Sequence, residues 1–215
     1  KLYQTDYLFW ADGHNAYGEP GSDPRSNAHW IVVTPQQLTV PAMGTASAYY
    51  AIQAPVQDDL RGTYWSLVMV EPINADMLEP PKPEANKAAV SIRSVARYAI
   101  QMVVQIGETG ERMLKFADRQ IVMVEGKRVL QLDLENTGER LLRPLVWAEL
   151  YDKQGILIGR FESGQSRIYP GCSVRRQIDL STAPAGLYKA LIVADNGDES
   201  IFGAQYDLDF REASK

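Results

Sequence analysis

The sequence predicts an all-β protein that contains two β-sandwich domains in tandem. Helical periodicity is scarce, whereas short runs of alternating or β-branched residues recur along the chain, and many of these runs end at a proline or a turn signal. The 215 residues suffice for two domains of about 100 residues each. Seven expected strands fall within roughly the last 90 residues, which is the size of an immunoglobulin-like sandwich. We therefore expect immunoglobulin-like domains at residues 1–116 and 117–215.

Composition and charge narrow the classes of function. Apolar residues make up 45% of the chain and charged residues 23%, which is the balance of a globular protein. The net charge is −5, and no basic stripe alternates with aromatic residues, so we expect no nucleic-acid partner. No apolar stretch approaches the roughly 20 residues that a membrane-spanning helix requires. We therefore expect no membrane insertion.

The cysteine content bears on disulfide bonds and redox compartment, and the first residue bears on processing of the chain. Cys172 is the single cysteine, so an intrachain disulfide is excluded, and either redox compartment remains open. The sequence begins with Lys1 rather than methionine. We expect a mature, processed or trimmed chain.

Prolines mark the expected strands of the first domain. The stretch GTYWSLVMVEP begins at Gly62 and stops at Pro72, as a buried strand would. Residues 7–13, YLFWADG, form an early strand and turn in this interpretation. The other expected strands are residues 30–34, 38–40 and 48–54, each followed by a proline.

A long loop and a long strand follow. Residues 72–87 are proline-rich and without periodicity, which predicts an exposed loop that joins two strands of one sandwich. Residues 88–106 are the longest strand-like segment. Its second half alternates, with an apolar face that we expect in the core rather than at a binding edge. That face comprises Tyr98, Ile100, Met102, Val104 and Ile106, and the other face carries Arg97, Gln101 and Gln105.

The second domain has clearer signals. We expect Trp147 to fill its core, and the Gly186-Leu187-Tyr188 sequence resembles a tyrosine corner. Residues 113–120 form the bridge between domains in this interpretation, and the two TGER sequences, 109–112 and 137–140, are turns. The expected strands are residues 121–125, 129–136, 146–151, 156–161, 174–180, 187–194 and 204–210.

The order of these signals resembles the PapD-like superfamily of periplasmic pilus-assembly chaperones. The resemblance rests on five features in this order: the WIVVTP segment at residues 30–35, TYWSLVMVEP, the proline-rich loop, the long alternating strand and a second immunoglobulin-like domain. The resemblance implies a non-enzymatic periplasmic protein whose partners are secreted pilus or fibre subunits and an usher. It also implies donor-strand complementation, in which the chaperone lends a strand to a subunit that lacks one. Lending that strand covers an aggregation-prone sheet edge.

The resemblance also assigns candidate residues. The donor positions fall on Val90, Ile92 and Ser94, although the family prefers a large apolar side chain at the third position. The family binds the subunit's terminal carboxylate with two basic residues, one on the first strand and one on the donor strand. The donor-strand position falls on Ala99, and no arginine is identifiable for the first-strand position. Arg97 is the candidate substitute, because a guanidinium can bind a carboxylate through two hydrogen bonds. Arg97 can equally be a plain surface or interdomain residue.

Other functions have weaker signals. His14, His29 and Cys172 offer a nucleophile and bases, but no catalytic signature surrounds them, and we expect no catalytic residue, metal or cofactor. The segment DNGDES, residues 195–200, is better explained as a hairpin turn than as a calcium loop. Asp207 and Asp209 share one face of an outer strand and are expected to be solvated.

The substitution of the family's basic residue by Ala99 supports a second interpretation. In it, the chain is a structural or adhesive module that binds another surface protein or a glycan.

Overall fold

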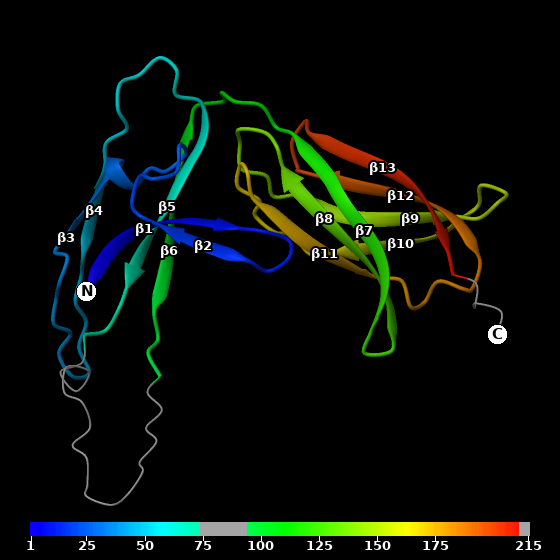
Figure 1. Ribbon diagram of the computed structural model, residues 1–215, viewed down its shortest axis with the longest axis horizontal. Coiled ribbons are helices and arrows are strands. Elements are labelled where there is room, and N and C mark those ends of the chain that lie inside the picture. The colour runs from blue at the N-terminus through cyan, green and yellow to red at the C-terminus, as the bar shows by residue number, and fades with distance from the viewer. Residues whose placement is uncertain (74–93, 211–215) are drawn as a thin grey trace, which may run out of the picture. The chain divides into compact units, whose positions relative to one another are not determined.

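The computed structural model describes residues 1–73 and 94–210. These residues contain thirteen strands and one short 3-10 helix, Ala28–Trp30 (η1), which confirms the predicted all-β class (Figure 1). No helix among them has the length and apolar character needed to cross a bilayer. The chain divides into two compact units, and the domain boundary expected at residue 116 stays a prediction. Unit 1 comprises Lys1–Tyr7, Tyr17–Asp59 and Tyr64–Val104, and unit 2 comprises Leu8–Ala16, Leu60–Thr63 and Gln105–Lys215.

The main sheet associated with unit 1 has the order β2-β1-β5-β6. β1 runs antiparallel to β5, with Leu2 opposite Val70 and Thr5 opposite Leu67. A separate two-stranded ribbon pairs β3 with β4. The strand bounds are β1 Leu2–Phe9, β2 Asn15–Gly18, β3 Ile31–Thr34, β4 Tyr49–Ile52, β5 Gly62–Val70 and β6 Tyr98–Ile106.

Strand β5 is the centre of this sheet. It lies between β1 and β6, and every residue from Gly62 to Met69 is buried. Burial on both faces explains why its apolar residues do not alternate strictly. Val68 from β5 packs with Ile31 and Met102 in a small apolar core. The strand predicted from the stretch GTYWSLVMVEP is therefore confirmed, with bounds Gly62–Val70.

Two expectations for the first part of the chain are wrong. Residues 38–40 form no strand, because they lie between Pro35 and Pro41 and pair with no strand of residues 1–73 or 94–210. The early strand expected at residues 7–13 instead starts at Leu2 and ends at Phe9, followed by a turn. Residues 2–6 were missed because LYQTD carries little apolar periodicity, and pairing with β5 stabilises them as a strand.

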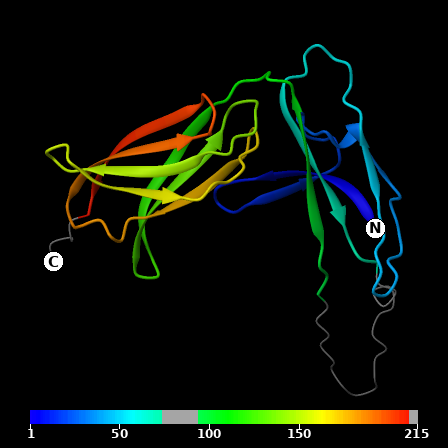
Figure 2. The same ribbon diagram turned by 180° about the vertical axis from the view of Figure 1, so that it is seen from behind.

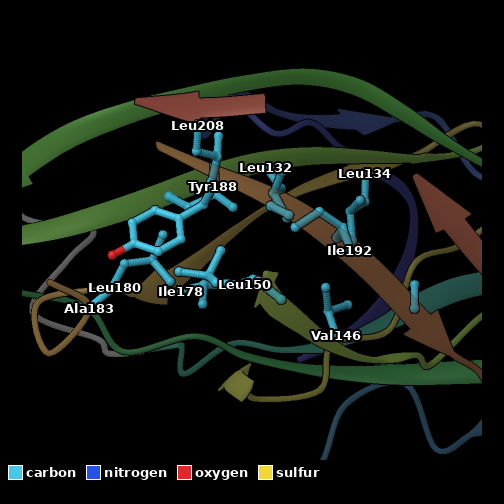
Figure 3. Close-up of a cluster of buried hydrophobic side chains, with 14 of the residues drawn as sticks. Leu132, Leu134, Val146, Leu150, Ile178, Leu180, Ala183, Tyr188, Ile192 and Leu208 are labelled. Carbon is cyan, nitrogen blue, oxygen red and sulfur yellow. The ribbon is translucent and has the colours of Figure 1, made fainter. Parts of the chain in front are cut away.

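Unit 2 is a sandwich of two sheets. One sheet has the order β10-β9-β12-β13 and the other β11-β8-β7. Fully buried side chains from both sheets fill the space between them, among them Leu132, Leu150 and Ile192 (Figure 3). This arrangement confirms the predicted immunoglobulin-like sandwich. The strand bounds are β7 Leu114–Val124, β8 Lys127–Asn136, β9 Leu145–Tyr151, β10 Leu157–Ser163, β11 Ser173–Asp179, β12 Leu187–Asp195 and β13 Ile201–Asp209.

The segment expected as a bridge, residues 113–120, belongs mostly to strand β7. It pairs with β8 from Leu114 onward, and Leu114 and Phe116 pack against the core. A register shift between Phe116 and Asp118 interrupts the alternation that would have identified the strand.

Trp147 does not fill the core, contrary to the prediction. The inward positions of β9 are Val146, Ala148 and Leu150, so alternation turns Trp147 to the outer face. There the guanidinium of Arg160 lies 3.9 Å from the ring centroid. The indole Nε1 donates to Glu149 Oε1 at 3.2 Å.

The tyrosine corner is confirmed. The hydroxyl of Tyr188 donates to the carbonyl oxygen of Pro184 at 2.9 Å, while its ring is buried against Phe210. The bond fixes the path of the chain into β12, the strand that pairs with both β9 and β13.

We predict that Tyr188→Phe lowers the free energy of unfolding by about 1 kcal/mol, because the Pro184 carbonyl loses its donor. Chemical denaturation followed by near-ultraviolet circular dichroism measures the change. Tyr151→Phe is the control, since it removes a hydroxyl that donates to Glu149 on the outer face. If the two substitutions lowered the free energy of unfolding equally, the hydrogen bond of the tyrosine corner would stabilise the fold no more than the hydrogen bond on the outer face.

Candidate functional site

Strand β6 forms one edge of the β2-β1-β5-β6 sheet. Within the described part of the chain, β5 is the only strand that pairs with it, and both views of the ribbon show the two strands side by side (Figures 1 and 2). The outer side of β6 therefore faces no strand of residues 1–73 or 94–210. An edge of this kind can add a strand from another chain.

Side chains on the apolar face of β6 become more exposed toward the start of the strand. Met102 is 8% exposed and packs with Ile31 and Val68, whereas Ile100 is 50% and Tyr98 67% exposed. The prediction that this face belongs to the core is therefore correct at Met102 and wrong at Ile100 and Tyr98. The small core ends at Met102, so the two preceding apolar side chains extend beyond it.

The strand predicted at residues 88–106 begins at Tyr98 in the structure. Residues 94–97 belong to no strand, and residues 88–93 lie outside the described residues. The late start has a physical cause. The neighbouring strand β5 ends at Val70, just before Glu71 and Pro72, so residues before Tyr98 have no ladder to join.

Three polar side chains from adjacent strand ends meet at the start of β6. Arg97 Nη2 lies 3.0 Å from Glu71 Oε1, with the Arg97 side chain about half exposed and Glu71 more buried. Desolvation raises the pKa of the Tyr3 phenol, and a hydrogen bond to Glu71 and the charge of Glu71 raise it further, although Arg97 acts in the opposite direction. We call these residues the Tyr3–Glu71–Arg97 cluster.

A cavity of about 820 Å³ lies beside this cluster, inside unit 1. Leu2, Val70 and Tyr98 line it from the sheet, and Leu38 and Val40 line it from the segment between β3 and β4. The lining is therefore largely apolar. Tyr98 both lines this cavity and stands at the exposed start of β6.

The structure separates the predicted site residues. Val90 and Ile92 lie outside the described residues, and Ser94 is exposed and precedes the strand. Arg97 is paired with Glu71, and Ala99 is exposed on β6.

Sequence analysis missed the contribution of Tyr3 and Glu71. Glu71 ends an apolar strand and Tyr3 stands in a strand with little periodicity, so no spacing rule connects either residue to Arg97.

The residues considered for catalysis show no assembled site. Cys172 is fully buried, and the ring of His14 stacks on Trp10, with 5.2 Å between centroids. His29 lies on η1 in unit 1. In the described ranges, no group of three or more histidine, cysteine, aspartate or glutamate residues could hold a metal ion.

We predict that Glu71→Gln lowers the pKa of Tyr3 toward its ordinary value of 10.0, because two of the causes that raise this pKa arise from the carboxylate. NMR titration of ring-labelled tyrosine measures the shift. Glu149→Gln is the matched control, since Glu149 raises the pKa of Tyr151 by the same type of hydrogen bond on unit 2. A Tyr3 pKa that is unchanged in Glu71→Gln would show that the cluster does not form.

Similarity to known proteins is found among solved structures and not among family profiles or curated proteins. No protein-family profile matches the chain, and no curated protein matches it. A solved chain from work on a chaperone–tip adhesin complex in CFA/I fimbriae biogenesis is similar to it, with 15% identity and a TM-score of 0.47. The similarity covers 96% of this chain and 83% of that chain. At this TM-score the likeness carries no argument, so the fold rests on the strands and sheets described above.

Proposed function

We propose that this chain is a non-enzymatic, PapD-like chaperone that lends strand β6 to an incomplete subunit of a surface fibre. The observation that carries the proposal is the edge of β6, where Tyr98 and Ile100 extend an apolar face beyond the core. Location in the periplasm and delivery of the subunit to an usher belong to the same proposal.

The edge supplies the two components that strand addition needs. Backbone groups on its outer side can form ladder hydrogen bonds with a partner strand, and alternate side chains can enter a groove of the partner. Fully burying one large apolar side chain is worth about 1.5–3 kcal/mol. Tyr98 and Ile100 are partly exposed in the chain alone, so each contributes part of that amount on binding.

Val90, Ile92 and Ser94 remain proposed donor positions. In the sequence they stand at even spacings from Tyr98 and Ile100. An extended chain would place all five side chains on one face, because side chains alternate along a strand. We propose that the partner extends the pairing from β6 toward these residues.

Arg97 remains the proposed anchor for a terminal carboxylate of the partner. A guanidinium has five N–H donors, and the contact with Glu71 is made through Nη2. The half-exposed side chain could therefore bind a second carboxylate. Glu71 would compete with that carboxylate, so it would tune the affinity of the anchor.

One observation favours the alternative of a structural or adhesive module. The β3–β4 ribbon exposes apolar side chains, among which Val32 is 64%, Tyr49 75% and Tyr50 63% exposed. Exposed tyrosines are frequent in contacts with other proteins. In this alternative the ribbon, rather than β6, meets another surface protein or a glycan.

Charged substitutions on the two surfaces distinguish the functions. We predict that Tyr98→Asp and Ile100→Asp each reduce recovery of the complex by roughly tenfold or more, because a carboxylate would be buried in the partner's groove. The assay is co-purification of this chain with a co-expressed secreted fibre subunit.

Tyr49→Asp is the matched control, since it places the same charge at a similarly exposed tyrosine of the ribbon. It should leave recovery unchanged, and circular dichroism checks that every variant is folded. Loss of the complex in Tyr49→Asp, with retention in Tyr98→Asp and Ile100→Asp, would support the adhesive module instead. Absence of any complex with the unmodified chain would contradict the chaperone function.

A further inference from the structure

We propose that two buried side chains, Asn27 and Arg140, fix the register of β6 on β5. They are positioning residues, because each acts through the backbone of β6 or of the turn that follows it. The consequence for partner recognition rests on the proposed function, whereas the register itself is a property of the chain alone.

An edge strand with one neighbour needs such a constraint. A slip of one residue exchanges the two faces of a strand, and a slip of two residues moves every side chain by about 7 Å along its neighbour. The small apolar core near β6 provides few contacts that would resist a slip, since Met102 is the only β6 residue in its buried cluster. Specific polar contacts can supply the missing resistance.

Asn27 connects β5 to β6 directly. Its side chain is fully buried, and Nδ2 donates to the carbonyl oxygens of Tyr64 on β5 at 3.2 Å and Met102 on β6 at 3.0 Å. Its Oδ1 accepts a hydrogen bond from the hydroxyl of Ser66 at 2.6 Å. One amide group therefore contacts both strands.

The segment before Asn27 is itself held in place. Residues 25–27 run beside Trp65, with Trp65 N donating to Arg25 O at 3.0 Å and an isolated parallel bridge between Ser26 and Trp65. The buried carboxylate of Asp6 accepts hydrogen bonds from the backbone N–H groups of Gly21 and Asp23 and from the hydroxyls of Ser22 and Ser26. Asn27 is thus presented from a fixed backbone.

Arg140 holds the other end of β6. Its guanidinium is almost fully buried within unit 2, and Nη1 donates to Gly107 O at 3.0 Å and Thr109 O at 2.9 Å. Its Nη2 lies 3.4 Å from Oε1 of Gln105, a residue of β6. Glu108 Oε2 in the same turn lies 3.3 Å from Nη2.

The residues on either side of Arg140 bond to β5, with Thr63 N donating to Glu139 O at 2.8 Å and Leu141 N donating to Thr63 Oγ1 at 2.9 Å. The turn that ends β6 is therefore held by a buried cation beside the start of β5.

A slip of β6 would carry these acceptors away from their donors. The amide of Asn27 would lose Met102 O, and the guanidinium of Arg140 would lose the carbonyls of the turn. Buried donors without acceptors are strongly disfavoured, and a buried charge without partners is disfavoured further. The native register is the one that satisfies both residues, and it determines where Tyr98 and Ile100 stand along the edge.

Hydrogen–deuterium exchange of the full chain without a partner tests the proposal. Asn27→Asp keeps the size of the side chain but replaces the donating amide by a carboxylate, which only accepts. We expect the amides of residues 98–106 to exchange roughly tenfold faster or more than in the unmodified chain, as loss of a buried hydrogen bond predicts. The amides of β12 in unit 2 should be unchanged.

Ser66→Ala is the local control, because it removes a bond to Asn27 Oδ1 and leaves both Nδ2 contacts in place. Arg140→Lys is the second variant, which tests the other end of β6 if Asn27→Asp does not fold. The proposal would be overturned if, in the variants that fold, the amides of residues 98–106 exchanged at the same rate as in Ser66→Ala. It would also be overturned if Asn27→Asp and Arg140→Lys both failed to fold while Ser66→Ala folded. A register role predicts a folded chain in which β6 alone is loosened.

Binding of the secreted fibre subunit separates this inference from the proposed function. If both are correct, Asn27→Asp weakens the complex as well as loosening β6, while Ser66→Ala weakens it less. Faster exchange in Asn27→Asp together with no binding by the unmodified chain would retain the register role and reject the chaperone. Normal binding by the unmodified chain, together with unchanged amide exchange in Asn27→Asp, would retain the chaperone function and reject the register role.

Discussion

Strand β6 has a paired strand on one side only, and the interpretation of unit 1 depends on this constraint. Its outer side meets no strand of the described chain, and the apolar side chains at its start extend beyond the small core, which ends at Met102. The same constraint leaves the strand poorly specified by packing, since β5 alone supplies its ladder. An exposed edge that must stay ordered needs contacts other than an apolar core.

The two units are stabilised by different kinds of contact. Unit 2 has a continuous apolar core between two sheets, to which Leu134, Val146 and Ile178 contribute as fully buried side chains. Unit 1 has a small apolar cluster and relies on buried polar groups, of which Asp6, Asn27 and Ser66 form hydrogen bonds. Directional bonds specify one arrangement more sharply than apolar contact does, which suits a strand that presents side chains at defined positions.

The sequence predicted most of unit 2 because its strands alternate and its turns carry clear signals. Unit 1 was less predictable, since β5 is buried on both faces and β1 shows little periodicity. Alternation correctly grouped Tyr98, Ile100 and Met102 on one face, but it could not show where the core ends. The contacts of Glu71 with Arg97 and of Asn27 with Met102 join residues far apart in sequence, and no local pattern encodes such pairs.

The most direct test of the central claim is hydrogen–deuterium exchange of the unmodified chain with and without a secreted fibre subunit. Strand addition at β6 predicts that the amides of residues 98–106 become protected when the subunit is added, because backbone groups on the outer side of the strand gain partners. The amides of the ribbon at residues 49–52 should stay unchanged. Protection of the ribbon without protection of β6 would contradict the account.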